Sequence, residues 1–598
     1  MSRDGPTEGC RFDEIVLCAL PGVALALGIM AAYSGQHMTN LMGGTLFDTD
    51  SFLRVARLRE ILDTGSWQAG LVARDNAPDG FYMHWTKPFD VLILGLAWLP
   101  AQFFGFDAAL PLVAGLISVI NLVILVAAGA WAVRPLAGSI GSSVSGVLVG
   151  TALPLQSYGL VGRADHHIMA VLLCVWFLGL TIRLARGGGP GTSILAGCVL
   201  SVSLWVTVET VPALLFCCGI LALARLGGGM RARIDLLGVT ATIVIGAAVF
   251  LDPPAAGARV AEIDRISVVY LSMVAFLAIG LMGCELSARY ASRGAHWGVA
   301  LICLGVSFLA WLCCFPELLK GPEAFLGEDL TRIWWEKIKE LRPAVSARDI
   351  ALFAGTGVMG AVAPWVLAVR ERRRPEALLY AALAVLTAIF VAMTIKHIRF
   401  APYAAAFGAI GLGIVVGRMS ELSRRPLKDQ GVAIVAIALA CIMAPMVAAI
   451  LAKGEAEEPA GLLAVGQAYR CEIRSVAAAL DDPIFMRVAR PIVLSEIGAA
   501  PELLYWTQRV RTIAGPYQRN VEGLRDFYGF LRSEAEAERI ARRRGITHVL
   551  LCPGGTAFQE DYAFGQAILA NQLPSWLHPV TWPTGVSTDL KLYEVYPR

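Results

Sequence analysis

Long apolar runs alternate with short polar segments over most of the chain. The first run covers Glu14 to Ser34, and twelve more follow at 108–133, 139–157, 166–186, 193–208, 210–226, 234–251, 266–286, 297–315, 350–369, 376–395, 400–417 and 432–452. A helix of about 20 apolar residues spans the hydrocarbon core of a bilayer. The pattern therefore predicts an α-helical polytopic membrane protein with about thirteen transmembrane helices.

Basic residues mark every second loop between these runs. They are Arg134, then Arg183 and Arg186, then Arg225, Arg231 and Arg233, then Arg289 and Arg293, then Arg370, Arg372, Arg373 and Arg374, then Arg418, Arg424, Arg425 and Lys428. The positive-inside rule places these loops and the N-terminus in the cytoplasm. The alternation holds only if the apolar segment from Phe89 to Phe104 does not cross. We therefore predict a juxtamembrane or re-entrant helix there, within a first outer loop at 35–107.

A polar tail follows the last apolar run. From about Glu455 the composition is that of a soluble domain, in which predicted strands at 491–494, 511–514 and 548–552 alternate with predicted helices at 501–508 and 533–544. Such alternation is typical of an α/β domain. We expect a transmembrane domain at 1–454 and a C-terminal α/β domain at 455–598, outside the membrane.

The first outer loop also contains an amphipathic pattern. From Ser51 to Asp63, apolar residues such as Phe52 and Leu53 occupy one side of a predicted helix, and Arg54, Arg57 and Arg59 occupy the other. Gly65 ends the helix. A helix of this kind is expected to lie along the membrane surface.

The composition agrees with a membrane protein and argues against binding of nucleic acid. The chain has 598 residues, of which 56% are hydrophobic and 16% charged, and its net charge of +3 indicates no nucleic-acid partner. Thirteen cysteines show no zinc-binding spacing. Cys471 and Cys552 lie in the tail and can pair if that tail is in an oxidising compartment; alternatively, Cys552 is simply buried at the end of a strand.

The strongest candidate for chemistry is the turn Phe47-Asp48-Thr49-Asp50-Ser51 after the first apolar run. Asp48 and Asp50 can share a divalent cation, and that cation can bind a phosphate. The alternative is that Asp50 and Ser51 only cap the following helix.

Further polar residues fall in the predicted outer loops. Asp165, His166 and His167 can complete the coordination of a metal held by the first turn, or can cap the next helix. Arg399 can bind a lipid phosphate or extend to head groups. The remaining candidates are Glu209, Glu340 and His397. A carboxylate at the membrane depth of Glu209 indicates function in general.

The order of these motifs resembles the catalytic subunit of oligosaccharyltransferase and its bacterial and archaeal single-chain forms. These are class C (GT-C) glycosyltransferases with thirteen spans and a C-terminal soluble domain. Asp48-Thr49-Asp50 looks like the family's first acidic motif, and Gly162 to His167 looks like the second. Glu340, near Pro343, looks like the glutamate of a late outer loop, and Arg399 looks like the arginine that binds the donor's diphosphate.

Two departures from the family pattern stand out. The second motif is Asp-His-His where the family has two acids, so a metal ligand here can be a histidine. The W-W-D-Y-G signature that reads the acceptor is absent, and Ser495-Glu496-Ile497-Gly498 stands at its expected place. The identity of the acceptor therefore cannot be carried over.

The resemblance implies a membrane glycosyltransferase at the outer face of a bacterial cytoplasmic membrane, with the tail in the periplasm. The donor would be a polyprenyl-phosphate or diphosphate sugar, and the acceptor an envelope lipid, polysaccharide or protein. Asp48 and Glu340 would be catalytic, with Mg²⁺ or Mn²⁺ on Asp48, Asp50, Asp165 and His167. His397 and Arg399 would bind the donor phosphate. The alternatives are a transporter or flippase of a lipid-linked substrate, and a non-catalytic relative.

Overall fold

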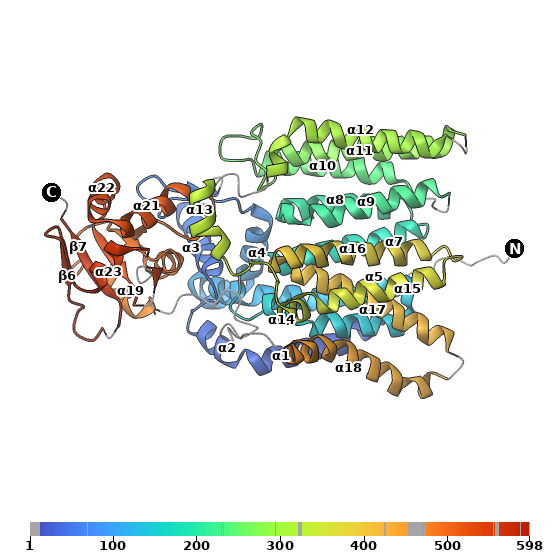
Figure 1. Ribbon diagram of the computed structural model, residues 1–598, viewed down its shortest axis with the longest axis horizontal. Coiled ribbons are helices and arrows are strands. Elements are labelled where there is room, and N and C mark those ends of the chain that lie inside the picture. The colour runs from blue at the N-terminus through green and yellow to red at the C-terminus, as the bar shows by residue number, and fades with distance from the viewer. Residues whose placement is uncertain are drawn as a thin grey trace.

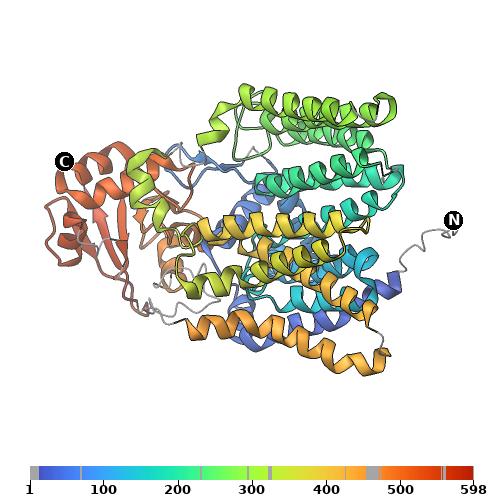
Figure 2. The same cartoon turned by 45° about the vertical axis from the view of Figure 1, so that its right-hand side comes forward.

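The computed structural model describes residues 12–67, 70–228, 230, 232–292, 295–320, 326–423, 426–452, 471, 473–553, 555–556, 561–586 and 588–596. Its larger part is a bundle of long apolar helices (Figures 1 and 2). They are α1 (Phe12–Tyr33), α5 (Phe106–Thr151), α7 (His167–Ala185), α8 (Pro190–Val206), α9 (Val211–Leu226), α10 (Ile234–Leu251), α11 (Val268–Tyr290), α12 (His296–Cys314), α15 (Gly355–Arg370), α16 (Ala377–Lys396), α17 (Ala401–Leu422) and α18 (Leu427–Leu451).

The bundle confirms the predicted class of membrane protein. Eleven helical segments of the described chain are long and apolar enough to cross a membrane. Helix α5 counts once among them, yet its 46 residues contain two predicted spans, separated by a kink at Gly138. There φ is +60°, which glycine adopts without steric cost. With α5 counted as two and the shorter apolar helix α8 added, the number is close to the predicted thirteen.

Small residues let the central helices approach closely. A Cβ atom placed on Gly417 of α17 would lie 2.3 Å from the carbonyl oxygen of Ala137 on α5. A Cβ on Gly22 of α1 would lie 2.3 Å from the carbonyl oxygen of Gly146, which also belongs to α5. Because lipid tails are as apolar as the helices, such backbone contact is a principal source of helix association in membranes. Helix α5 is therefore the central element of the bundle.

The segment between α1 and α5 lies between the bundle and the tail (Figure 1). It contains α2 (Gly35–Met42), α3 (Thr49–Thr64), α4 (Lys87–Phe104) and the antiparallel strands β1 (Leu71–Val72) and β2 (Phe81–Tyr82). Helix α4 corresponds to the apolar segment that was predicted not to cross, and it is not among the eleven candidate spans of the described chain.

Helix α3 forms where the sequence predicts a helix, and protein covers it. Asp48 caps its N-terminus and Gly65 ends it in the left-handed conformation. The arginine side is not a polar face, because Arg54 and Arg57 are buried and both pair with the fully buried Asp90 of α4, Arg54 at 2.6 Å. The tail covers α3, so its buried charges are neutralised by neighbouring residues. A position along the membrane surface stays a prediction.

Short helices complete the loops at the tail end of the bundle. They are α6 (Leu153–Tyr158), η1 (Val208–Thr210), η2 (Pro316–Lys320), α13 (Gly327–Ile333), η4 (Trp335–Lys337), α14 (Ala347–Asp349), η5 (Ile350–Ala354) and η6 (Ile398–Phe400). The loop that carries α13 and η4 packs into the tail, because Leu326, Leu330, Trp334 and Trp335 belong to the tail's hydrophobic core.

The tail is an α/β unit, as the alternation of strands and helices predicts. Its elements are α19 (Arg474–Asp481), β3 (Ile492–Ser495), α20 (Ala500–Trp506), β4 (Arg511–Thr512), α21 (Val521–Arg532), α22 (Glu534–Arg544), β5 (His548–Leu551), α23 (Ala563–Leu569), β6 (Leu577–Val580) and β7 (Lys591–Val595). The sheet order is β4-β3-β5-β7-β6: β4, β3 and β5 are parallel, and β7 is antiparallel to both of its neighbours, β5 and β6. The expected domain boundary at 454–455 lies outside the described residues.

The first outer loop closes the edge of this sheet. The amide N–H of Thr512 on β4 donates to the carbonyl of Arg74 at 2.8 Å, and that of Ala77 donates to the carbonyl of Thr512 at 2.9 Å. Asp75, fully buried between them, accepts hydrogen bonds from the Thr512 hydroxyl at 2.8 Å and the Gly515 N–H at 2.9 Å. The tail is thus fixed to the bundle through backbone pairing and one buried carboxylate.

We expect this contact to respond to pH. Burial raises the pKa of Asp75 to about 6 although its hydrogen-bond donors favour the charged form. The folded state therefore binds the proton more tightly than the unfolded chain, so the contribution to stability is present at low pH and lost as the pH rises through about 6. Between pH 7 and 5 it amounts to about 1 kcal/mol. Thermal unfolding of wild type and Asp75→Asn across this range measures it; parallel pH dependences would contradict the assignment.

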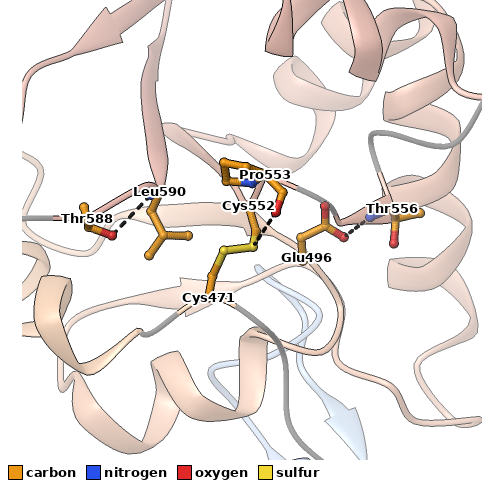
Figure 3. The surroundings of a disulfide bond; sticks show 7 residues. All are labelled: Cys471, Glu496, Cys552, Pro553, Thr556, Thr588 and Leu590. Carbon is orange, nitrogen blue, oxygen red and sulfur yellow. Dashed lines mark hydrogen bonds between the residues drawn. A yellow bond between two sulfur atoms is a disulfide. The ribbon is translucent and has the colours of Figure 1, made fainter. Parts of the chain in front are cut away.

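The tail contains the disulfide between Cys471 and Cys552, with Cα atoms 6.0 Å apart (Figure 3). Of the two alternatives for Cys552, pairing and burial, the structure has both, since Cys552 is 1% exposed. The bond joins the beginning of the described tail to the end of β5.

Loss of this disulfide is expected to destabilise the tail. Cys471→Ser should lower the free energy of unfolding by about 2–4 kcal/mol, because the bond closes a long loop in the unfolded chain. Thermal unfolding with and without reductant measures the effect, and Cys313→Ser, which removes an exposed free thiol, is the control. Labelling of Cys552 by a maleimide in unfolded, unreduced protein would show that the bond does not form.

Candidate active site

Two turns from different outer loops meet at the tail end of the bundle. Asp48 accepts hydrogen bonds from the N–H of Ser51 at 2.9 Å and from its hydroxyl at 2.5 Å. The same hydroxyl oxygen accepts the N–H of Ala164 at 2.7 Å. The N–H of Phe47 donates to the carbonyl of Gly162 at 2.9 Å. Asp48 therefore caps α3 and also lies against the Asp-His-His turn.

Arg163 stands between the carboxylates of these loops. Its Nε atom lies 3.0 Å from Asp48 Oδ2, and its Nη2 atom lies 2.9 Å from Glu340 Oε1 and 3.6 Å from Asp165 Oδ2. The face of Tyr158 lies 4.4 Å from the guanidinium carbon. The side chain is 2% exposed. Three carboxylates thus share one buried cation, and they come from three loops far apart in the sequence.

Asp165, His166 and His167 form a compact group of possible metal ligands. One ligand atom from each lies within 4.8 Å of the others, and the two imidazole rings stack at 4.9 Å. Asp165 lies 3.1 Å from Nδ1 of His166 and 3.4 Å from Nε2 of His167. Although burial opposes it, the two histidines hold the pKa of the Asp165 carboxyl well below its ordinary value. This carboxylate therefore stays ionised.

Glu209 and Arg399 extend the group toward α9 and α17. Glu209 lies in η1, and its Oε2 atom is 3.6 Å from Nδ1 of His167. Its other oxygen pairs with Nη2 of Arg399, which lies in η6. The polar side chains are thus positioned by the short 3₁₀ turns that begin these helices.

Glu340 and His397 are linked through backbone contacts. The N–H of Arg399 donates to the carbonyl of Glu340 at 2.9 Å, which fixes the loop of Glu340 beside η6. Nδ1 of His397 lies 2.6 Å from the carbonyl oxygen of Leu341. His397 is thereby engaged with the backbone of this loop, whereas Arg399 reaches the carboxylate of Glu209.

Asp50 lies next to the same acids in the first turn of α3. Burial, followed by repulsion from Asp165, Asp48 and Glu340, raises the pKa of Asp50 well above its ordinary value. Burial also raises the pKa of Asp48, opposed by Arg163. The acids of the site exceed its fixed cations locally, which is a setting that attracts a further cation.

Sequence reasoning assigned no role to two residues of this neighbourhood. The sequence places Arg163 in the second motif, but it does not show that Asp48, Asp165 and Glu340 are its partners. His84 precedes α4; burial lowers the pKa of His84 to about 3, with Asp264 and Arg519 the main charges acting on it and His166 and Arg399 also contributing. The sequence signal for His84 is that this histidine lies in the predicted first outer loop.

The residues present fit a divalent cation. Nδ1 of His167 and Oε2 of Glu209 are buried, and neither has a hydrogen-bond partner within the described part of the chain. Buried polar atoms without partners are costly, and an imidazole nitrogen beside carboxylate oxygens is a ligand set for Zn²⁺, Mn²⁺ or Fe²⁺. Asp165, His166 and His167, with Glu209 adjacent, would hold such an ion.

Comparison with known proteins agrees with this architecture. No protein-family model and no curated protein matches the sequence. The oligosaccharyltransferase AglB from Archaeoglobus fulgidus, solved with an inhibitory peptide and a dolichol-phosphate, aligns over 97% of this chain and 74% of its own, with a TM-score of 0.67 and 16% identity. A structure of the Archaeoglobus enzyme with Zn and sulfate aligns over 90% and 67%, with a TM-score of 0.64 and 15% identity.

The chain therefore has the fold of the class C glycosyltransferases. Within that fold it resembles the single-chain archaeal oligosaccharyltransferase. ArnT from Cupriavidus metallidurans, bound to undecaprenyl phosphate, aligns over 97% of this chain and 98% of its own, with 13% identity and a TM-score of only 0.41.

The expected position of the acceptor-reading motif is occupied differently. β3 ends at Ser495, and the next residue, Glu496, is 1% exposed. Its Oε2 atom accepts the N–H of Thr556 at 3.1 Å, beside the disulfide (Figure 3). This acid contributes to the internal packing of the tail.

Proposed function

We propose that the protein transfers a sugar or oligosaccharide from a polyprenyl-phosphate or diphosphate carrier to an acceptor at the tail end of the helix bundle. The observation that carries the proposal is the meeting of Asp48, Asp165, His167, Glu209, Glu340 and Arg399 in one group of ion pairs. Carboxylates, imidazoles and a guanidinium are the groups needed to bind a cation and a phosphate.

The donor's phosphate would lie near Arg399 and His166. Arg399 opens α17, so its side chain is at the end of the bundle, where the head group of a membrane-embedded carrier would be. Arginine binds phosphate oxygens through two N–H groups at once. The Archaeoglobus enzyme has been solved with a dolichol-phosphate and, separately, with Zn and sulfate, which supports a phosphate carrier as donor.

Asp165, His166 and His167 would hold a divalent cation. Such an ion supplies positive charge to the phosphate as it leaves. The resemblance implied Mg²⁺ or Mn²⁺ on Asp48, Asp50, Asp165 and His167. The two adjacent histidines favour Mn²⁺ over Mg²⁺, because imidazole suits transition metals.

Asp48 and Glu340 would act on the acceptor. The acceptor's nucleophilic atom attacks the anomeric carbon, the bond from that carbon to the phosphate oxygen breaks, and the phosphate leaves with the electron pair. The raised pKa of Asp48 makes its carboxylate a better proton acceptor than an exposed aspartate. Asp48 is thus our candidate for orienting the nucleophile and taking its proton.

A transporter fits the arrangement less well. Transporters of this size bind substrate near the middle of the bilayer, at broken helices. Here His167 begins α7, Glu209 precedes α9 and Arg399 precedes α17. Chemistry at the membrane surface accounts for this placement, and passage through the bundle does not require it.

The acceptor is an envelope lipid, polysaccharide or protein. An acceptor peptide with an N-V-T sequon is tethered to the Archaeoglobus enzyme in one structure, but the W-W-D-Y-G motif is absent from this sequence. We therefore favour transfer to a non-protein acceptor at least as much as to protein. The chain would lie in a bacterial cytoplasmic membrane with its tail in the periplasm.

Asp165→Asn and Asp48→Asn should each abolish transfer while the protein remains folded. Complementation of a deletion strain, with mass spectrometry of envelope glycans and glycoproteins, measures this: the missing product should return with wild type and not with either variant. Glu336→Gln, in the same loop as Glu340 but exposed, is the control and should restore it.

EDTA should stop transfer in isolated membranes, and Mn²⁺ should recover it. Full activity of a chelated preparation would refute the cation.

Arg399→Lys should weaken binding of the carrier about tenfold, because lysine cannot make the two-pronged contact of arginine with a phosphate. Quenching of tryptophan fluorescence by a polyprenyl phosphate, compared with the uncharged polyprenol, measures this in the purified protein. His397→Ala is the informative comparison, since His397 contacts the Leu341 carbonyl. Equal losses in both variants would contradict a specific role for Arg399.

A further inference from the structure

We infer that Ser51 and Arg54 of α3 are positioning residues for the Asp-His-His turn, and that they act by binding the backbone of Ala164, the residue before Asp165. The inference rests on the proposed function and deepens it, since it names the side chains that hold the possible metal ligands in place. It follows from the contacts of Ala164 and of Arg54.

Both polar backbone groups of Ala164 are bound by side chains of α3. Its N–H donates to the hydroxyl oxygen of Ser51 at 2.7 Å, and its carbonyl accepts from Nε of Arg54 at 3.0 Å. Ser51 and Arg54 are three residues apart and therefore share one face of the helix. Ala164 is 0% exposed. Loss of either bond would thus leave a buried backbone group without that partner, which is costly.

The Arg54 side chain is itself fixed by the segment around the start of α4. Its Nη1 atom lies 2.6 Å from Oδ1 of Asp90, which is fully buried. The rings of Trp85 and Phe89 lie 4.1 and 4.8 Å from the guanidinium carbon. The guanidinium thus donates in two directions, to Asp90 and to Ala164, while two aromatic rings pack on it.

Helix α5 binds the residues of the turn that precede Ala164. The hydroxyl of Ser118 donates to the carbonyl of Arg163 at 2.7 Å, and the N–H of Gly162 donates to the carbonyl of Gly115 at 2.7 Å. Ala164 itself is bound by α3. Loss of a contact from α3 should therefore loosen the turn locally and leave the bundle intact.

The position of Ala164 bears directly on the possible metal ligands, because Asp165 follows it. The Asp165 carboxylate lies 3.1 Å from Nδ1 of His166 and 3.4 Å from Nε2 of His167. Groups that orient metal ligands contribute to affinity, and their mutation typically weakens metal binding by about 10- to 100-fold. Ser51 and Arg54 orient this group through the backbone.

Arg57 provides a matched control for Arg54. It lies one turn further along α3, is 5% exposed and pairs with the other carboxylate oxygen of Asp90. Its guanidinium carbon lies 5.6 Å from the ring of Trp85. Within the described part of the chain, no hydrogen bond or ion pair joins Arg57 to the turn. The two arginines thus share a partner and differ in the contact with Ala164.

The test begins with amide hydrogen–deuterium exchange of the purified full-length protein in detergent, without added metal. In Arg54→Lys, peptides that cover residues 160–168 should exchange at least about fivefold faster than in wild type. The reason is that lysine keeps a charge for Asp90 but has only one nitrogen, which cannot also donate to Ala164. Arg57→Lys should change the exchange of these peptides less than about twofold, and peptides from α17 should be unchanged in both variants.

A second measurement is Mn²⁺ binding to the same proteins, followed by electron paramagnetic resonance. The Kd for Mn²⁺ should rise at least about fivefold in Arg54→Lys, because the turn that carries the ligands is less ordered. It should change less than about twofold in Arg57→Lys. A Kd that stays constant although the turn exchanges faster would overturn the inference.

Unchanged exchange of the turn in Arg54→Lys overturns the inference, and so does an equal increase in both variants. If wild type binds no Mn²⁺, the cation of the proposed function fails, and the exchange measurement alone decides the positioning role. If Arg54→Lys is not monodisperse on size exclusion, Ser51→Ala replaces it. That variant removes the acceptor of the Ala164 N–H, so exchange of the turn should again rise at least about fivefold, and unchanged exchange overturns the inference.

Discussion

The buried charge of Arg163 is the interaction on which the candidate site depends. A guanidinium removed from water is costly unless carboxylates and hydrogen-bond acceptors surround it. Asp48, Asp165 and Glu340 supply that environment from three loops. Each of these acids would in turn be costly to bury beside the others without the cation. The three loops are therefore held together by their shared contacts with one guanidinium.

The tail contributes to this arrangement without supplying any of those charges. The hydroxyl of Tyr517 donates to the carbonyl of Thr49, inside the Asp-Thr-Asp turn, at 3.2 Å. Arg519 pairs with Glu262 at 2.7 Å, in the loop between α10 and α11. Trp334 and Trp335, a few residues before Glu340, are buried in the tail's core. The soluble unit thus fixes the loops that carry the polar residues of the bundle.

The same packing explains why both the apolar and the arginine residues of α3 are buried in protein. Its apolar residues pack in one core with residues of α5, and Arg54 and Arg57 pair with Asp90. Helix α20 of the tail also packs on it, where Tyr505 contacts Phe52 and Arg59. An amphipathic pattern states only that a helix has two kinds of face. Whether lipid, water or another protein segment covers each face depends on the rest of the chain.

The sequence by itself determined the class of protein, the approximate number and position of its spans, and three strands and two helices of the tail between 491 and 552, but not α21 (Val521–Arg532). These features follow from local periodicity and from the length of apolar runs. It also indicated the residues with suitable chemistry, from Asp48 to Arg399, because charged side chains are few in so apolar a chain. Only the tertiary structure decided that Asp48 faces Arg163, that His397 faces a backbone carbonyl and that Glu209 pairs with Arg399. Such partners are separated by up to hundreds of residues, and ion pairing is set by distance in space, which local sequence patterns do not encode.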